Sequence, residues 1–186
     1  IDYGVSEGGT NVTFINYDNE LGDSTTVLGL AGLTEPTVVE IGAMYPASSY
    51  TSSVAGTKIT HICYPFTTIS ETSGLGIVEG SDVTFRIYGQ GYNGQPGEVL
   101  AEKVVPYKDL KVGEFTIAQY DEPVSLTGFN VWATVSFIQP VSTNQNPQLP
   151  LIFDGMTENL APYGDIIRIG NSGPFFLASE QFQKSY

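Results

Sequence analysis

Apolar and polar side chains alternate residue by residue through the middle of this chain, over residues 82–138. Four runs carry the pattern: DVTFRIY, EVLAEKVV, GEFTIAQY and FNVWATVSFI. Successive side chains of a strand point to opposite faces of a sheet, so the alternation predicts strands with one buried face and one more polar face. Gly, Pro, Asn and Asp fill the junctions, as in GQGYNGQPG, and predict turns there.

The same alternation predicts which side chains point inward. Those expected inside are Val83, Phe85, Ile87, Phe115, Ile117, Phe129, Val131, Ala133, Val135 and Phe137. Those expected on the opposite face are Thr84, Arg86, Tyr88, Asn130, Trp132, Thr134 and Ser136. The pattern thus predicts one continuous apolar surface, and a more polar face that carries the single tryptophan of the chain.

Strand patterns recur on both sides of this segment, at 11–17, 37–45 and 57–66 and near Leu151, Ile167 and Phe176. In 37–45 one side is apolar: Val39, Ile41, Ala43 and Tyr45. In 57–66 one face carries Ile59, His61 and Cys63, and the other carries Ile62 and Tyr64. About ten strands without a helix longer than a turn indicate an all-β fold, an antiparallel two-sheet β-sandwich of jelly-roll type. Residues 1–10 are predicted to be a linker or frayed segment, and 11–186 a single β-sandwich domain.

The charge of the chain excludes several kinds of partner. Its 20 acidic residues against 7 Lys and Arg give a formal net charge of −13. A phosphate backbone or an anionic membrane surface would be repelled, so no nucleic-acid partner is expected. No apolar run approaches the roughly 20 residues of a membrane-spanning helix, so no membrane insertion by this domain is expected. Only 15% of the residues are charged, and such neutral polar surfaces are common on exported bacterial proteins.

The order of the runs between residues 57 and 170 is similar to that of a known kind of module. A strand ending in RIY, a loop containing PG and the strand PVSLTGFNVW follow one another, and LPLIFDG and GDIIRIG come after them. Together they resemble the jelly-roll accessory and adhesin-like β-sandwich modules of secreted bacterial surface proteins, in the style of gingipain adhesin regions. The resemblance implies a sandwich fold and a secreted or cell-surface-anchored location. Its motifs are structural, so it transfers no active site.

Four residues are candidates for ligand binding. Trp132 is predicted on the polar face, where an indole stacks on a sugar ring while polar neighbours bond the hydroxyls. The alternative is that a loop or a second layer covers it, because tryptophan is usually largely buried. Tyr88, Tyr92 and Asn93 lie on or beside GQGYNGQPG, and loops on rigid β-scaffolds often carry function. The alternative for these three is that they serve the turn alone.

A serine-hydrolase interpretation is weaker. GNSGPF around Ser172 resembles the loop of a nucleophilic serine, and His61 with Cys63 resembles the context of a general base. The acids between them are Asp82, Asp109 and Asp121. Pro174 stands where that loop has a glycine, however, and His61 lies in an alternating strand. A satisfied strand histidine is the preferred interpretation.

Glycosidase and metal chemistry have no specific signature. A glycosidase needs two facing carboxylates, and Glu40, Glu114 and Asp154 lie in strand patterns, where a glutamate usually faces solvent. A structural calcium ion is the alternative kept for YDNELGD, whose oxygen donors are Asp18, Asn19, Glu20 and Asp23. With one His and one Cys, a zinc or copper site is not expected. Cys63 is expected to be a buried thiol without an internal disulfide.

The sequence therefore favours a non-catalytic, extracellular binding or adhesion module of a larger surface protein. Its partner would be a glycan, a host protein or a neighbouring surface protein, bound without a cofactor through loops or through the face that carries Trp132. The main alternative is a structural spacer domain with no ligand, followed by a serine hydrolase or a glycosidase.

Overall fold

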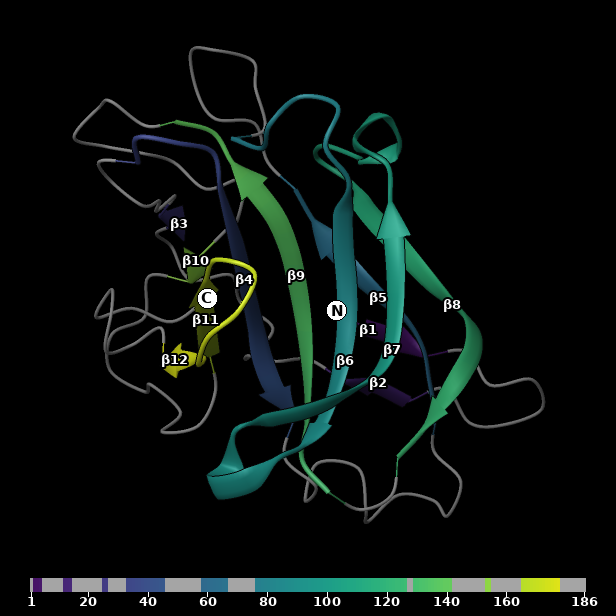
Figure 1. The fold of residues 1–186 in the computed structure, drawn as a ribbon. Coiled ribbons are helices and arrows are strands. Elements are labelled where there is room, and N and C mark those ends of the chain that lie inside the picture. Colours follow the sequence, from purple (N-terminus) through teal and green to yellow (C-terminus); the bar gives the residue numbers. More distant parts are fainter. Residues whose placement is uncertain are drawn as a thin grey trace.

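The structure of this chain, a computed structural model, describes residues 2–4, 12–14, 25–26, 33–45, 58–66, 76–126, 129–141, 153–154 and 165–177. Antiparallel β-strands make up nearly all of their regular structure (Figure 1). The helical elements of the described residues are two single 3-10 turns, η2 (Tyr92–Gly94) and η3 (Tyr107–Asp109). Within these ranges, no helix has the length and apolar character that crossing a membrane requires. The predicted all-β class is confirmed.

The largest sheet has six strands in the order β12–β11–β4–β9–β6–β7, and each neighbouring pair is antiparallel. The strands are β4 (Thr37–Tyr45), β6 (Val83–Gln90), β7 (Pro96–Val105), β9 (Val131–Gln139), β11 (Asp165–Ile169) and β12 (Phe176–Leu177). β4 pairs with β9 over its full length. The strands of this sheet therefore lie where the alternation predicted them, with ends shifted by about two residues at most.

The other described strands form antiparallel pairs. β5 (Lys58–Pro65) pairs with β8 (Phe115–Ser125), and both lie behind the six-stranded sheet in Figure 1. β1 (Asp2–Gly4) pairs with β2 (Val12–Phe14), and β3 (Thr25–Thr26) pairs with β10 (Phe153–Asp154). The strand at β1 lies within the residues predicted to be a linker.

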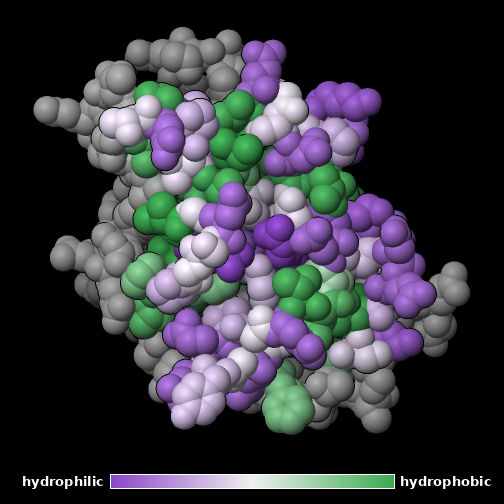
Figure 2. Space-filling model, viewed as in Figure 1, coloured by the Kyte–Doolittle hydropathy of each residue, from purple (hydrophilic) through white to green (hydrophobic). Residues whose placement is uncertain are grey.

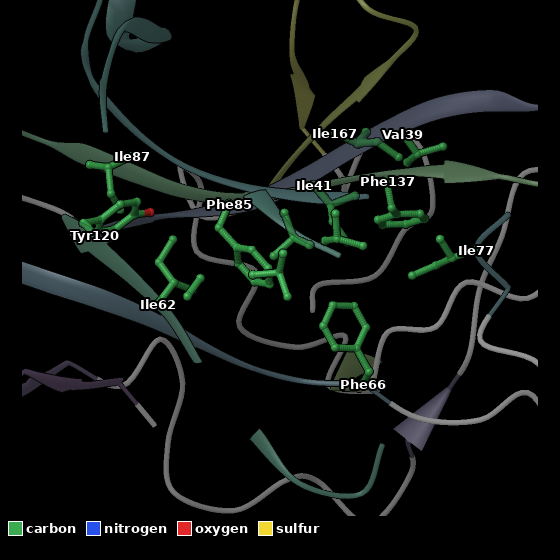
Figure 3. Close-up of a cluster of buried hydrophobic side chains, with 14 of the residues drawn as sticks. Val39, Ile41, Ile62, Phe66, Ile77, Phe85, Ile87, Tyr120, Phe137 and Ile167 are labelled. Atoms are coloured by element: carbon green, nitrogen blue, oxygen red, sulfur yellow. The ribbon is translucent and has the colours of Figure 1, made fainter. Parts of the chain in front are cut away.

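The hydrophobic core lies between one face of the six-stranded sheet and the β5–β8 pair (Figure 3). We call this the inner face of the large sheet. Its fully buried side chains include Val39, Ile41, Val83, Phe85, Ile87, Val135, Phe137 and Ile167. Ile62, Phe66, Ala118, Tyr120 and Val124 meet them from the other side. The inward positions predicted for β4, β6 and β9 from Val131 onward are confirmed, because apolar burial dominates the choice of face.

The predicted inner face of β8 is wrong. Phe115 and Ile117 point outward, and Ile117 is 57% exposed, whereas Thr116, Ala118 and Tyr120 are buried. β8 continues to Ser125, and its buried Val124 has the same parity as Ala118 and Tyr120. A one-residue slip moves every side chain of a strand to the other face. The face of β8 that packs on the core is therefore the one that includes Val124 as well as Ala118 and Tyr120. Phe129 is also wrong as an inward residue, because it precedes β9 and is 60% exposed.

A register shift explains the mixed faces of β5. Ile59 pairs with Val124, but His61 pairs with Gln119, so the ladder is irregular between Ile59 and His61. A bulge reverses the relation between sequence parity and face. Ile59 and Ile62 therefore both contact the core, although simple alternation places them on opposite sides.

Candidate functional site

The outer face of the six-stranded sheet, opposite the core, contains a fully buried carboxylate. Glu40 occupies the centre of β4 and is 0% exposed. Strand alternation turns it away from its neighbours Val39 and Ile41, which lie in the core. A buried carboxylate is stable only when charges and hydrogen bonds compensate for lost hydration, so its partners determine what this face can do.

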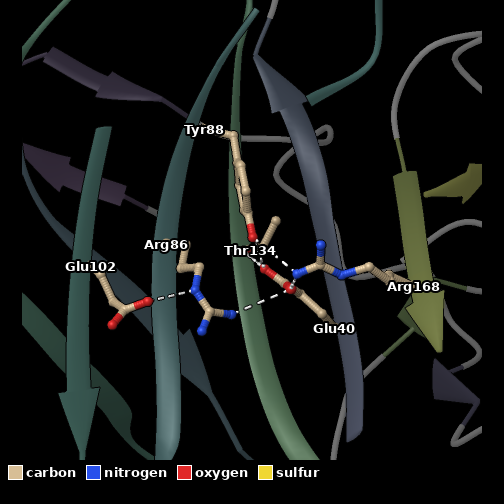
Figure 4. Close-up of polar contacts among 6 residues, drawn as sticks. All are labelled: Glu40, Arg86, Tyr88, Glu102, Thr134 and Arg168. Atoms are coloured by element: carbon tan, nitrogen blue, oxygen red, sulfur yellow. Dashed lines mark hydrogen bonds and ion pairs between the residues drawn. The ribbon is translucent and has the colours of Figure 1, made fainter. Parts of the chain in front are cut away.

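Four side chains surround Glu40 (Figure 4). Arg168 of β11 donates a hydrogen bond to Oε2, and Nη1 of Arg86 lies 3.3 Å from the same oxygen. The hydroxyls of Tyr88 and Thr134 donate to Oε1 over 2.9 and 2.6 Å. Both carboxylate oxygens are therefore satisfied, and two guanidinium groups balance the charge.

Strand register places these groups side by side. Arg168 pairs directly with Glu40 across β11 and β4. Arg86 pairs with Thr134 on one side and with Glu102 on the other, and its Nε donates to Glu102 over 2.7 Å. Positive and negative charges thus alternate across the sheet, from Arg168 through Glu40 and Arg86 to Glu102. We call these residues, with Tyr88 and Thr134, the Glu40 network.

Gly42, two residues along β4, gives the network room. A Cβ atom at this position would overlap the carbonyl oxygen of Ala133 and the side chain of Thr134. Gly42 pairs with Thr134 across β4 and β9. The missing side chain therefore lets Thr134 occupy the outer face beside Glu40.

The network shifts the titration of two of its members. Burial, followed by the charge of Glu40, raises the pKa of Tyr88 from 10.0 to about 12. Burial lowers the pKa of Arg86, but the hydrogen bond to Glu102 and the charge of Glu40 outweigh it, so that pKa is raised. Tyr88 therefore stays protonated, and remains a donor to Glu40, well above neutral pH.

We expect an ultraviolet pH titration to show a tyrosine ionisation near pH 12 that is lost in Tyr88→Phe. The folded state holds this proton up to about pH 12, whereas the unfolded chain releases it near 10.0. The free energy of unfolding therefore falls as the pH rises between these two values. Tyr88→Phe should have a smaller fall than the parent over the same window, measured by urea unfolding. Equal slopes would show that Tyr88 is not held by Glu40.

A second apolar cluster lies on the outer face beside the network. Its buried members are Tyr88, Trp132 and Ile166, and Met44, Phe175 and Leu177 pack against them. The ring of Phe175 meets that of Tyr88 edge-on at 5.6 Å. The Arg168 guanidinium lies 4.5 Å from the centre of the Phe175 ring, a cation–π distance. The segment after β11 thus covers both the cluster and part of the Glu40 network.

Trp132 and Tyr88 lie together, but they are buried. Trp132 is on the outer face, as predicted, and is only 1% exposed. Its indole packs among apolar side chains, so the alternative of a covered tryptophan describes this structure. Figure 2 shows the outer face, where hydrophilic residues across the middle separate groups of hydrophobic ones. Trp132 and Tyr88 offer no ring face to a ligand here.

Tyr92 and Asn93 lie elsewhere, at the tip of the β6–β7 hairpin. Tyr92 is 86% exposed and Asn93 is also exposed, with a left-handed backbone at φ 55°. Asparagine tolerates this conformation better than most residues, so the turn accounts for Asn93. Binding by Tyr92 and Asn93 stays a prediction.

An open depression of about 370 Å³ lies beside this hairpin. Its lining is Gly89, Gln90, Gly91, Glu98, Leu100, Ser125, Phe129, Asn130 and Val131. Two amides, a hydroxyl and a carboxylate thus share the surface with the exposed ring of Phe129. Sequence reasoning missed Phe129, Gln90, Glu98 and Asn130 as a group, because β6, β7 and β9 meet only through the sheet order.

The structure does not assemble the proposed hydrolase. His61 lies on β5, and its Nδ1 is 2.8 Å from the hydroxyl of Thr60. Ser172 lies in the turn between β11 and β12, in the other sheet. Cys63 is buried, as expected. These positions suit a strand histidine and a turn serine.

The other carboxylate candidates are also separated. Glu40 is enclosed by two arginines, whereas Glu114 is exposed before β8 and lies 4.0 Å from Lys111. Asp154 belongs to β10, in another strand pair. Within the described part of the chain, no three His, Cys, Asp or Glu side chains gather as metal ligands would. The calcium candidates Asp18, Asn19, Glu20 and Asp23 lie outside the described residues.

Among the described residues, the candidates are the closed Glu40 network, which is structural in its chemistry, and the open depression at the β6–β7 end. Comparison with models of protein families, with curated proteins and with solved structures gives no match for this chain.

Proposed function

We propose that this chain is a non-catalytic, extracellular binding module of a larger surface protein, and that it binds glycan at the β6–β7 end of the large sheet. The supporting observation is a depression lined by amide groups and one exposed aromatic ring, with a second exposed ring on the adjoining turn. Phe129 lines it, and Tyr92 follows the lining residue Gly91. Exposed aromatic rings beside convergent polar groups are characteristic of binding sites.

The side chains of the depression suit a sugar. The apolar C–H face of a pyranose packs on an aromatic ring, which here is Phe129. Gln90 and Asn130 each offer an amide that both donates and accepts, and Ser125 adds a hydroxyl. Sugar hydroxyls need both kinds of partner.

Close contacts connect the strands that carry the site. The backbone N–H of Asn130 donates to Oε1 of Gln90 over 3.1 Å, which ties the end of β6 to the start of β9. Gly91 and Gly97 approach so closely that a Cβ atom on Gly91 would lie 2.8 Å from Cα of Gly97. A preformed surface loses less entropy when a ligand binds.

The wider assignment rests on other grounds. The core between the six-stranded sheet and the β5–β8 pair supports a jelly-roll type of sandwich. The resemblance to adhesin-like modules and the neutral polar composition support a secreted or surface-anchored location. Affinity at so open a site is expected to be weak unless several copies act together.

We expect multivalent display of the protein on a glycan array to give specific binding that Phe129→Ala weakens by about tenfold, since an apolar ring contact is lost. Tyr92→Ala should weaken it as well, because Tyr92 is exposed at the same end. Phe115→Ala is the matched control. Phe115 is an exposed aromatic residue at the opposite end of the molecule, where β8 begins (Figure 1).

Binding that Phe115→Ala abolishes and Phe129→Ala leaves intact would place the site elsewhere. Silence of the parent protein on every glycan would contradict the proposal and favour a spacer domain. Circular dichroism and thermal unfolding of each variant separate loss of binding from loss of fold.

A further inference from the structure

We infer that the depression at the β6–β7 end selects uncharged glycans and rejects glycans that end in an acidic sugar. This inference rests on the proposed function, because it names the ligand class of the same site. The selectivity follows from the charges around the depression, and not from its shape.

The charged side chain that lines the depression is Glu98 of β7. None of the described residues that line it is a lysine or an arginine. Lys58 is brought near by strand register, since it pairs with Ser125, but it is exposed and does not line the depression. The cations of the Glu40 network are already ion-paired: Arg86 pairs with Glu102 and Glu40, and Arg168 pairs with Glu40.

Recognition of an acidic sugar needs a different surface. Carboxylate and sulfate groups are bound in proteins by arginine forks, lysines or groups of backbone N–H donors. A ligand carboxylate placed here would meet Glu98, and two like charges at contact distance repel each other even in water. The formal net charge of −13 acts in the same direction over a longer range.

The same carboxylate favours an uncharged sugar. An ionised carboxylate accepts hydrogen bonds at both oxygens, and hydrogen bonds to a charged acceptor are stronger than neutral ones. Two adjacent sugar hydroxyls can donate to Glu98 while Gln90 and Asn130 satisfy the remaining donors and acceptors. We therefore assign both roles to Glu98: it binds the hydroxyls of an uncharged sugar, and it repels an acidic sugar.

The test uses matched multivalent probes, lactose-terminated and 3′-sialyllactose-terminated neoglycoproteins, with galactose-, glucose-, mannose- and N-acetylglucosamine-terminated probes beside them. The parent protein should bind at least one neutral probe and at least about tenfold less of the sialylated one. Glu98→Gln should lower the ratio of neutral-probe binding to sialylated-probe binding about fivefold, as expected for removing one like charge near contact distance.

Glu114→Gln is the matched control. It makes the same change in net charge at an exposed site before β8, away from the depression, so it should leave the ratio unchanged. Equal narrowing by both variants would show that overall charge acts and not Glu98, which overturns the inference. Equal or tighter binding of the sialylated probe by the parent would overturn it too, while leaving a glycan-binding function in place. Silence on every probe would overturn both.

Discussion

Glu40→Ala is expected to lower the free energy of unfolding by about 3–5 kcal/mol, measured by urea unfolding at neutral pH. The substitution leaves the guanidinium groups of Arg86 and Arg168 facing each other on the outer face without the carboxylate between them. It also removes the acceptor for the hydroxyls of Tyr88 and Thr134. Unpaired polar groups in a buried position lose hydration without compensation.

Glu102→Ala is the matched control for this prediction. Glu102 contacts the same Arg86, but it is 47% exposed at its side chain, so its loss should cost at most about 1 kcal/mol. The double variant Glu40→Leu with Arg168→Met should recover much of the stability lost in Glu40→Ala, because it replaces an ion pair by apolar contacts. Equal effects of Glu40→Ala and Glu102→Ala would mean that Glu40 is not enclosed in solution.

Trp132→Ala is expected to cost about 3–5 kcal/mol of stability, because it leaves a large cavity on the outer face. Trp132 packs against Tyr88 and Ile166, so the loss spreads to the Glu40 network. Circular dichroism during urea unfolding measures the change, since the variant has no tryptophan left to follow by fluorescence.

Phe176→Ala tests the same region from the exposed side. Phe176 lies on β12 and is exposed, so its loss should cost less than about 1 kcal/mol of stability.

Glycan binding is expected to be independent of Trp132. At a temperature where Trp132→Ala remains folded, this variant should bind glycan as the parent does, because Trp132 does not line the depression. A stable Trp132→Ala protein that has lost binding would return Trp132 to the role of a sugar platform.

The sequence was sufficient to predict strands because burial acts on each residue locally. Val83, Phe85 and Ile87 alternate with more polar neighbours, and the core selects them whatever the strand order is. The inner face of β8 was not predictable from GEFTIAQY alone, because Phe115 and Ile117 are more apolar than the side chains of that run that are buried. Val124, which lies outside that run, belongs to the buried face of β8 and helps to determine it.

The candidate sites depended on information that alternation does not contain. A strand glutamate such as Glu40 usually faces solvent, and its two arginines come from β6 and β11, which are far from it in sequence. Likewise, Phe129 and Glu98 share a depression only because β9 and β7 both flank β6. Sheet order and register decide such neighbours, and neither can be read from the period of the pattern.

The Glu40 network has a consequence for how the protein is made. The hydrogen bond between Arg168 and Glu40 spans 128 residues of chain, and that between Thr134 and Glu40 spans 94. During synthesis, β4 leaves the ribosome long before either partner has been made, so the carboxylate of Glu40 stays hydrated until then. Long-range pairing of this kind makes folding slow. A nascent chain that stops before Arg168 should therefore be recognised by chaperones, even though its β4–β9 pair is complete.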